Sequence, residues 1–242
     1  MCCFTKPVER VEQTRIYARA EGAQQLVVYE LKLQASEDLA MVLPIPIAMG
    51  SGDRAVKFVD LTSSPTFFAG LAYAFREQEL ELQAKSRGPA PQGLAVHQVG
   101  AFEASFVPRA QDFDRLDPRF SISSALWRTV PSVDGFGFVV FKLRPSKTLR
   151  AFHPMAFWFA RRDLQRVFFP TLHVHDGTVH ENAIFDHVLY AQPDIVTSGW
   201  EPSPYDMNGG VGGAGRTLVL PRPGQRRVLN GSLPNADVWI NG

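Results

Sequence analysis

The alternation of apolar and polar residues predicts a chain built mainly of short strands. Most apolar runs are short, rich in β-branched or aliphatic residues, and separated by breaks such as Glu-Gly-Ala at 21–23, a pattern typical of strands. The run from Ala40 to Ile47 is apolar on both parities, which indicates a strand that is buried on both sides and ends at its prolines. The predicted strands are residues 14–19, 25–33, 39–47, 56–60, 96–107, 136–143, 152–159 and 167–175.

Two helices are predicted within this series of strands. Ser64 and Pro65 supply a cap and a first-turn proline, which are signals for the start of a helix. Apolar residues then recur at helical spacing and predict a helix to about residue 79; they are Phe67, Phe68, Leu71, Ala72 and Phe75. A shorter helix is predicted over 111–116. Many strands with few helices favour an α+β fold, with a mostly antiparallel sheet and the helices on one side.

The composition changes near residue 196. The last 47 residues hold nine of the 19 glycines and five of the 18 prolines, and such a stretch buries too little apolar surface to fold alone. We therefore expect a single α+β domain over 1–195 and an extended Gly/Pro-rich tail over 196–242. The tail, with one late strand at 217–220, is expected to dock on the body or on a second subunit, which would make a homo-oligomer.

Overall composition narrows the classes of partner and compartment. Apolar residues make up 45% of the chain, so a globular protein is expected. The formal net charge is +1, so no overall electrostatic attraction favours binding to nucleic acid or to an anionic membrane. The start of the chain, Met-Cys-Cys-Phe-Thr-Lys-Pro, lacks the apolar region of a secretory signal. The two cysteines, Cys2 and Cys3, are adjacent and poorly placed for a structural disulfide. These features favour a cytoplasmic protein.

One segment concentrates residues that could carry chemistry. Four of the six histidines lie within 173–187, and Asp176-Gly177 separates two alternating runs. Asp-Gly favours a two-residue type I′ turn, and the resulting hairpin would place His173 directly across from His180. His175 would share their face because strand residues two apart point the same way. His187, seven residues beyond His180, would join them only if the chain bends near residues 182–183.

Three converging imidazoles suit a transition metal such as Zn, Cu or Fe, and three ligands with an open position are typical of a catalytic site. The expectation is a metal-binding protein, either without catalysis or as a metal-dependent hydrolase or oxidoreductase that acts on a small molecule. Glu181 and Asp186 are candidate acceptors for the imidazole N–H groups. Two alternatives stay open: a solvated hairpin face, and a proton-relay or pH-sensing cluster.

Cys2 supports a second class of function. Removal of Met1 would leave Cys2 with both a thiol and a free amine, the chemistry of an amino-terminal cysteine-nucleophile amidohydrolase. Cys2 could equally be a small buried residue at the start of a docked strand, or a thiolate ligand beside the imidazoles. A third class is a non-catalytic interaction module whose tail recruits a partner or a second subunit.

Several segments resemble an uncharacterised bacterial protein family, over roughly residues 1–192. They are Met-Cys-Cys-Phe at the start, Asp38 to Pro46, Val99 to Pro108, His153 to Phe157, and Phe-Pro-Thr-Leu-His-Val-His-Asp-Gly at 169–177. The first three are also distantly similar to a second bacterial family of unknown function. The resemblance implies a single cytoplasmic domain and implies no activity.

Overall fold

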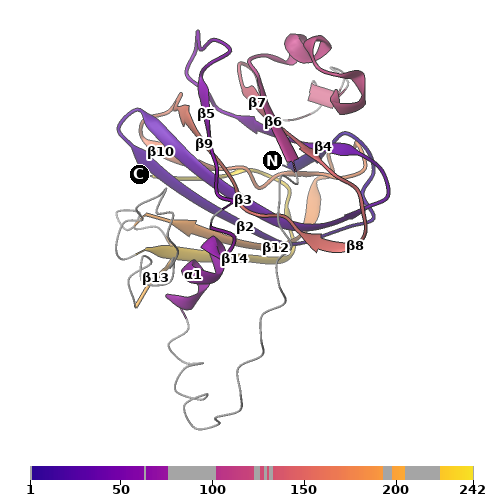
Figure 1. The fold of residues 1–242 in the computed structure, drawn as a ribbon. Coiled ribbons are helices and arrows are strands. Elements are labelled where there is room, and N and C mark those ends of the chain that lie inside the picture. The colour runs from indigo at the N-terminus through magenta and orange to yellow at the C-terminus, as the bar shows by residue number, and fades with distance from the viewer. Residues whose placement is uncertain are drawn as a thin grey trace.

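The structure is a computed structural model, and it describes residues 2–62, 64–75, 102–122, 126–127, 130, 133–192, 198–204 and 224–241. Its body is formed by two mixed β-sheets that face each other (Figure 1). The five-stranded sheet has, in spatial order, β11 (His173–Val174), β1 (Cys2–Phe4), β4 (Leu39–Ile45), β7 (Gly137–Leu143) and β6 (Phe102–Val107).

The second sheet has eight strands. Seven follow one path: β13 (Glu201–Pro202), β14 (Gln225–Pro234), β12 (Asn182–Ala191), β2 (Arg10–Glu21), β3 (Gln24–Ala35), β9 (Met155–Ala160) and β5 (Val56–Val59). The eighth strand, β8 (Ser146–Ala151), pairs with β3 off this path. A separate two-stranded ribbon joins β10 (Arg166–Phe169) to β15 (Val238–Asn241). The helices of the described part include α1 (Phe67–Tyr73) and the 3-10 helices η1 (Ala110–Arg115) and η2 (Pro118–Phe120).

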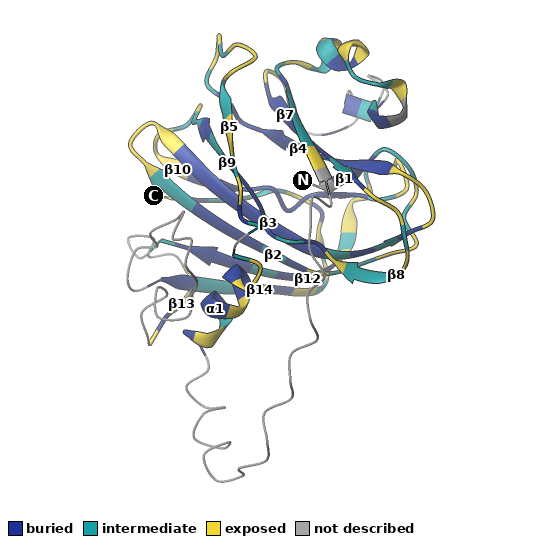
Figure 2. Cartoon of the chain, viewed as in Figure 1, coloured by how far each residue is buried: buried dark blue, intermediate teal, exposed yellow. Residues whose placement is uncertain are grey.

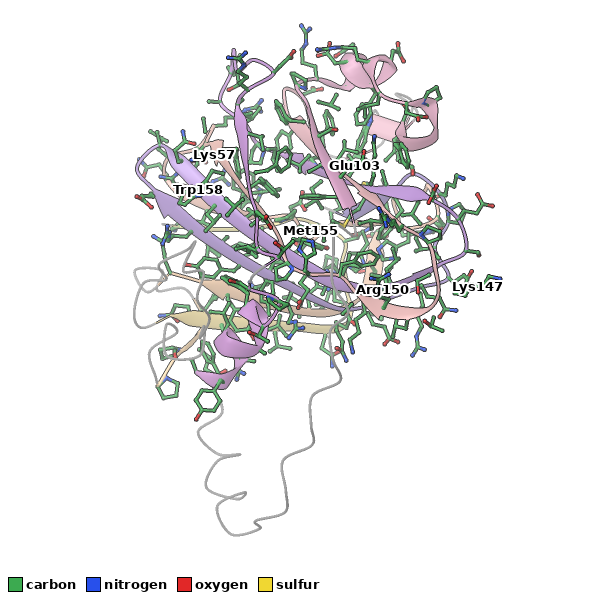
Figure 3. All side chains as sticks on the ribbon, in the orientation of Figure 1. Lys57, Glu103, Lys147, Arg150, Met155 and Trp158 are labelled. Carbon is green, nitrogen blue, oxygen red and sulfur yellow. The ribbon has the colours of Figure 1, made fainter. Side chains whose placement is uncertain are left out.

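The main core lies between the two sheets. Alternate residues of the strands point into it, as Ile16 and Ala18 of β2 do, while the intervening Tyr17 belongs to a smaller cluster on the opposite face. Side chains fill the space between the sheets, with Met155 inside it and Lys147 and Arg150 of β8 at its rim (Figure 3). The two-residue period of the strands therefore sorts each one into an inner and an outer face.

The outer face of the eight-stranded sheet is partly covered by α1. Phe67, Phe68 and Leu71 of α1 are buried against Tyr17, Tyr190 and other residues of the sheet. Figure 2 shows the helix with its buried side toward the sheet and an exposed side toward solvent. Among the described residues no helix is long and apolar enough to cross a membrane.

The predicted α+β class is wrong, because the described part of the chain is a β-rich fold with very little helix. The segment predicted as a helix over 111–116 is a 3-10 helix, and α1 is only seven residues long. Residues 76–79 of the first predicted helix lie outside the described residues. The strand predicted over 39–47 is confirmed over 39–45, where every residue of β4 is buried.

The predicted C-terminal tail contributes strands to the body. β14 pairs with all ten residues of β12, and β15 pairs with β10. The Gly/Pro-rich composition of 196–242 led the sequence analysis to miss the strand at 225–234, whose residues alternate between inner and outer positions. The strand predicted at 217–220 lies outside the described residues.

Candidate functional site

Three of the predicted histidines meet in the core, but they are not the three that the hairpin model selected. His173 comes from β11, His187 from β12, and His175 follows β11. The Nε2 atoms of His173 and His187 are 2.9 Å apart, so one ring donates a hydrogen bond to the other. The His175 ring stacks on His173 with centroids 4.8 Å apart. We call His173, His175 and His187 the histidine cluster.

Aromatic rings close the histidine cluster on two sides. The Phe185 ring lies 4.5 Å from the His173 ring, and the Phe4 ring lies 5.4 Å from the His175 ring, measured between centroids. His173 and His187 are 9% and 2% exposed. Burial, together with the smaller effect of neighbouring imidazoles, lowers the pKa of His173 to about 2 and that of His175 to about 4. All three rings are therefore neutral near pH 7.

The chain bends at Asp176-Gly177, but neither the predicted type I′ turn nor the predicted hairpin forms, because Asp176 is not among the described non-glycine residues with a positive φ. Gly177 has a φ of 80°, and Oδ1 of Asp176 accepts the N–H of Thr178 at 3.0 Å. However, β11 pairs in parallel with β1, in the register Cys2 to His173. Residues 178–180 are not in a strand, and His180 instead donates from Nε2 to Oδ2 of Asp176 at the surface, at 2.8 Å. The predicted pairing of His173 with His180 is wrong because the N-terminal strand pairs with β11.

The expectation of a metal-binding protein, and of a metalloenzyme with it, is corrected by this geometry. His173 and His187 direct their Nε2 atoms at each other, and His180 lies apart in solvent. Over the residues that the structure describes, no group of three His, Cys, Asp or Glu side chains is placed to hold a metal ion. The side chain of Cys2 lies outside the described part, so its role as a nucleophile stays a prediction.

Asp186 connects the histidine cluster to the outer face of the sheet. It alternates with Phe185 and His187 on β12 and is exposed, whereas those two are buried. Its Oδ2 accepts the N–H of Gln13 at 2.6 Å, and its Oδ1 lies 3.5 Å from Nδ1 of His187. Partial burial opposes the charge, but the contacts with His187 and Gln13 prevail and lower the pKa of Asp186 below its usual value.

A β-bulge in β2 supplies the N–H that Asp186 accepts. The register between β2 and β3 shifts between Glu12 and Arg15, and Gln13 is the only non-glycine with a positive φ, 53°, among the described residues. This conformation is unfavourable for an L-residue with a long side chain. The bulge therefore turns the backbone toward β12 at a conformational cost.

Outside the sheet, the same strands form the floor of a groove of about 860 Å³. β2 contributes Arg15, β12 contributes Asp186 and Tyr190, and β14 contributes Arg226 and Val228. Its walls are formed by Ala72 of α1, by Phe75 just beyond that helix, and by residues 201–204. We call this feature the outer groove.

Two arginines in the outer groove are held by carboxylates and aromatic rings. Arg226 donates from Nη2 to Oε2 of Glu201 at 2.7 Å, and its guanidinium lies 4.7 Å from the centre of the Phe75 ring. Arg15 pairs with Glu30, and its guanidinium lies 5.5 Å from the Phe68 ring. Burial raises the pKa of Glu30 to about 7, against the opposing effect of Arg15. The arginines are thus fixed while part of each side chain stays exposed.

Sequence reasoning did not find the outer groove. Arg15, Phe75, Glu201 and Arg226 are far apart in the chain and share no motif. One signal was present: Glu30 is the only acidic residue in the apolar segment 25–33, and a buried carboxylate requires a cationic partner. The sequence does not say that Arg15 is this partner, because the pairing depends on the register of β2 with β3.

Comparison with solved structures identifies the architecture. Baculovirus P35 superposes with a TM-score of 0.51 at 12% sequence identity, covering 99% of both chains. The chain has the fold of baculovirus P35. At this identity the likeness concerns the fold alone. No family model matches the chain, and no curated protein matches it.

Two further P35 structures have similar coverage but lower scores. P35 in a complex with caspase-8 gives a TM-score of 0.49 at 11% identity over 95% of this chain, and a mutated P35 after caspase cleavage gives 0.48 at 13% over 97%. In the first of these, P35 has a protein as its partner, whereas the sequence of the present chain had suggested a small molecule or a metal ion.

Proposed function

We propose that this protein is a non-catalytic protein-binding module and that the outer groove is its binding surface. The observation that carries the proposal is the arrangement of Arg226, which is held by Glu201 and Phe75 beside the exposed Val228. Arginine and aromatic side chains are enriched at the centres of protein interfaces. Because Arg226 is already held in place, little side-chain freedom is lost when a partner binds.

The histidine cluster supports a binding role over a catalytic one. Histidine is the usual general acid or base near neutral pH, but His173 and His187 are closed inside the core with pKa values below the ordinary one. Neutral, buried imidazoles that contact one another and aromatic rings stabilise packing. The imidazole rings that suggested catalysis or metal binding in the sequence therefore contribute to core packing.

A protease is the partner class that we propose for the outer groove. The reason is an analogy at the level of the fold, which P35 shares over its full length and which does not by itself establish function. Since a P35 structure contains caspase-8, active caspase-8 is the first protease to use as a probe.

Binding of the full chain to active caspase-8 tests the proposal, measured by biolayer interferometry and by gel filtration of the mixture. We expect a stable complex and slower cleavage of a fluorogenic peptide by the caspase. Arg226→Ala should weaken the complex by about 30-fold, as expected for truncation of a central interface arginine.

Arg166→Ala is the matched control. Arg166 also pairs with a carboxylate, Asp163, at 2.7 Å, and lies 4.6 Å from the Trp239 ring, but it belongs to a different part of the surface. Its removal should leave the affinity unchanged. Absence of a complex with caspase-8 would contradict the protease partner, and equal losses for the two variants would contradict the outer groove as the binding surface.

A further inference from the structure

A second pocket, of about 640 Å³, lies beside the ribbon that β10 forms with the C-terminal strand β15 (Figure 1). Its lining includes the buried side chains of Phe136 and Leu172 and the partly buried Trp239. Arg162 and Arg166 line it as well, and we call this feature the arginine pocket. A pocket of this volume, with apolar and aromatic walls and a few polar groups, is typical of small-molecule sites.

Arg162 is held by backbone carbonyl groups instead of a carboxylate. Its Nη1 donates to the carbonyl oxygen of Asp134 at 2.9 Å, its Nη2 donates to that of Gly135, and its guanidinium lies 5.4 Å from the centre of the Phe136 ring. Gly135 has a φ of 67°, and a side chain at this position would collide with Nη2. Among the described residues no carboxylate pairs with Arg162. Its positive charge is therefore available to an anion.

Arg166 is held along one edge of its guanidinium. Its Nε donates to Oδ2 of Asp163 at 2.7 Å, and the guanidinium lies 4.6 Å from the centre of the Trp239 ring. Trp239 is the partner of Phe168, so Arg166, two residues before Phe168, is its diagonal neighbour on the same face. The side chain of Arg166 is 48% exposed, and its two Nη groups have no hydrogen-bond partner among the described residues. Such a pair of N–H groups matches the two oxygens of a carboxylate.

The carboxylates of the pocket limit the charge that a ligand can carry. Oδ1 of Asp163 accepts the N–H of Gln165 at 2.8 Å, and Oδ1 of Asp237 accepts the N–H groups of Thr171 and Leu172, each at 2.9 Å. These two carboxylates balance the formal charge of the two arginines. A ligand with one negative charge fits this balance, whereas a second negative charge would be repelled.

We propose that the arginine pocket binds a small organic carboxylate that carries a fused aromatic ring system. The carboxylate accepts N–H groups from Arg162 and Arg166, and the rings lie against Phe136, Leu172 and Trp239. Both guanidinium groups are already held in place, so little side-chain freedom is lost when the ligand binds. The arginine pocket shares no lining residue with the outer groove, and the inference goes beyond the protein-binding function proposed above.

Isothermal titration calorimetry of the full chain with 1-naphthaleneacetate tests the proposal. We expect binding at a single site, with an affinity that falls as the salt concentration rises. The amide 1-naphthaleneacetamide has the same rings without the charge and should bind about tenfold more weakly or worse. The same loss is expected for 1-naphthyl phosphate, which carries close to two negative charges at about pH 8.

Leu164 allows the charge of the pocket to be changed without disturbing the core, because it lines the pocket and is 55% exposed. Leu164→Glu should weaken the binding of 1-naphthaleneacetate by about threefold through repulsion, whereas Leu164→Lys should not weaken it. Arg166→Ala should weaken binding by about tenfold, as expected for the loss of a hydrogen bond to a charged group. Urea midpoints of the variants report whether folding is intact, and the exposed Leu164 pair keeps the test valid if Arg166→Ala unfolds.

Arg226→Ala is the matched control. It removes an arginine that is held in the same way, by a carboxylate and an aromatic ring, but in the outer groove. The affinity for 1-naphthaleneacetate should stay as in the wild type.

A chain that does not bind 1-naphthaleneacetate at millimolar concentration would overturn the proposal. So would equal affinities for the acetate and the acetamide, equal affinities of the Leu164→Glu and Leu164→Lys variants, or tighter binding of 1-naphthyl phosphate. None of these outcomes depends on binding to a protease, so this inference and the proposed function can fail separately.

Discussion

The histidine cluster and the outer groove lie on opposite faces of the same strand, β12, and they differ in every property that decides function. Phe185 and His187 point inward and are almost fully buried, whereas Ile184 and Asp186 point outward and are exposed. The histidines, which are the residues best suited to catalysis or metal binding, are shielded from solvent. The residues that can meet a partner are an acidic residue, aliphatic side chains and fixed arginines. A concentration of histidines in a sequence is therefore no measure of how accessible they are.

The largest expected effect is a difference in the free energy of unfolding between substitutions on the inner and the outer face of β12. Phe185→Ala removes a buried ring that contacts His173 and His187, and it should lower the free energy of unfolding by about 3–5 kcal/mol. Ile184→Ala, one residue away but 73% exposed, should change it by about 0.5 kcal/mol or less. Urea denaturation followed by tryptophan fluorescence measures both. Similar losses would mean that the two faces are not distinguished as the structure describes.

A smaller effect should appear as pH is lowered. Above the ordinary histidine pKa of 6.5 the cluster is neutral in both the folded and the unfolded chain, so it makes no contribution that depends on pH. Below 6.5 the unfolded chain binds protons that folded His173, with a pKa of about 2, does not bind. Stability should therefore fall, by about 2 kcal/mol from His173 alone at about pH 5.

Urea midpoints at neutral pH and at about pH 5 measure this loss. His173→Gln should reduce the dependence on pH, although it also changes packing at neutral pH. A wild-type chain that is equally stable at both pH values would contradict a closed, neutral histidine cluster.

The smallest effect concerns Asp186, which joins the two regions. Asp186→Ala removes the acceptor for the N–H of Gln13 and should cost about 1–2 kcal/mol of stability, as expected when a donor loses its partner. Asp186→Asn keeps an acceptor oxygen and should cost less. Hydrogen exchange at Gln13 gives a local measurement, with faster exchange in the alanine variant. An unchanged exchange rate at Gln13 would contradict the stabilisation of the bulge by Asp186.

Local features of the fold could be predicted from the sequence, and long-range pairings could not. β4 was recognisable because its residues are apolar on both parities. The Asp-Gly pair also indicated a bend at Gly177, although the type I′ turn predicted there is not adopted. Whether β11 then pairs with residues 178–180 or with β1 is a competition between distant segments that no local pattern records. The same limit applies to the candidate site. The segment around His187 was recognisable, but the register that brings its ring to His173 was not.

Both sheets are completed by pairings between distant parts of the chain, since Cys3 of β1 pairs with Val174 and Arg15 of β2 pairs with Val188. A growing polypeptide therefore cannot finish either sheet until β11 and β12 have left the ribosome. Such a topology folds slowly, because large loops must close before these contacts form. During synthesis the incomplete sheets expose apolar strands, and we expect C-terminal truncations before β12 to aggregate rather than to accumulate as a smaller domain.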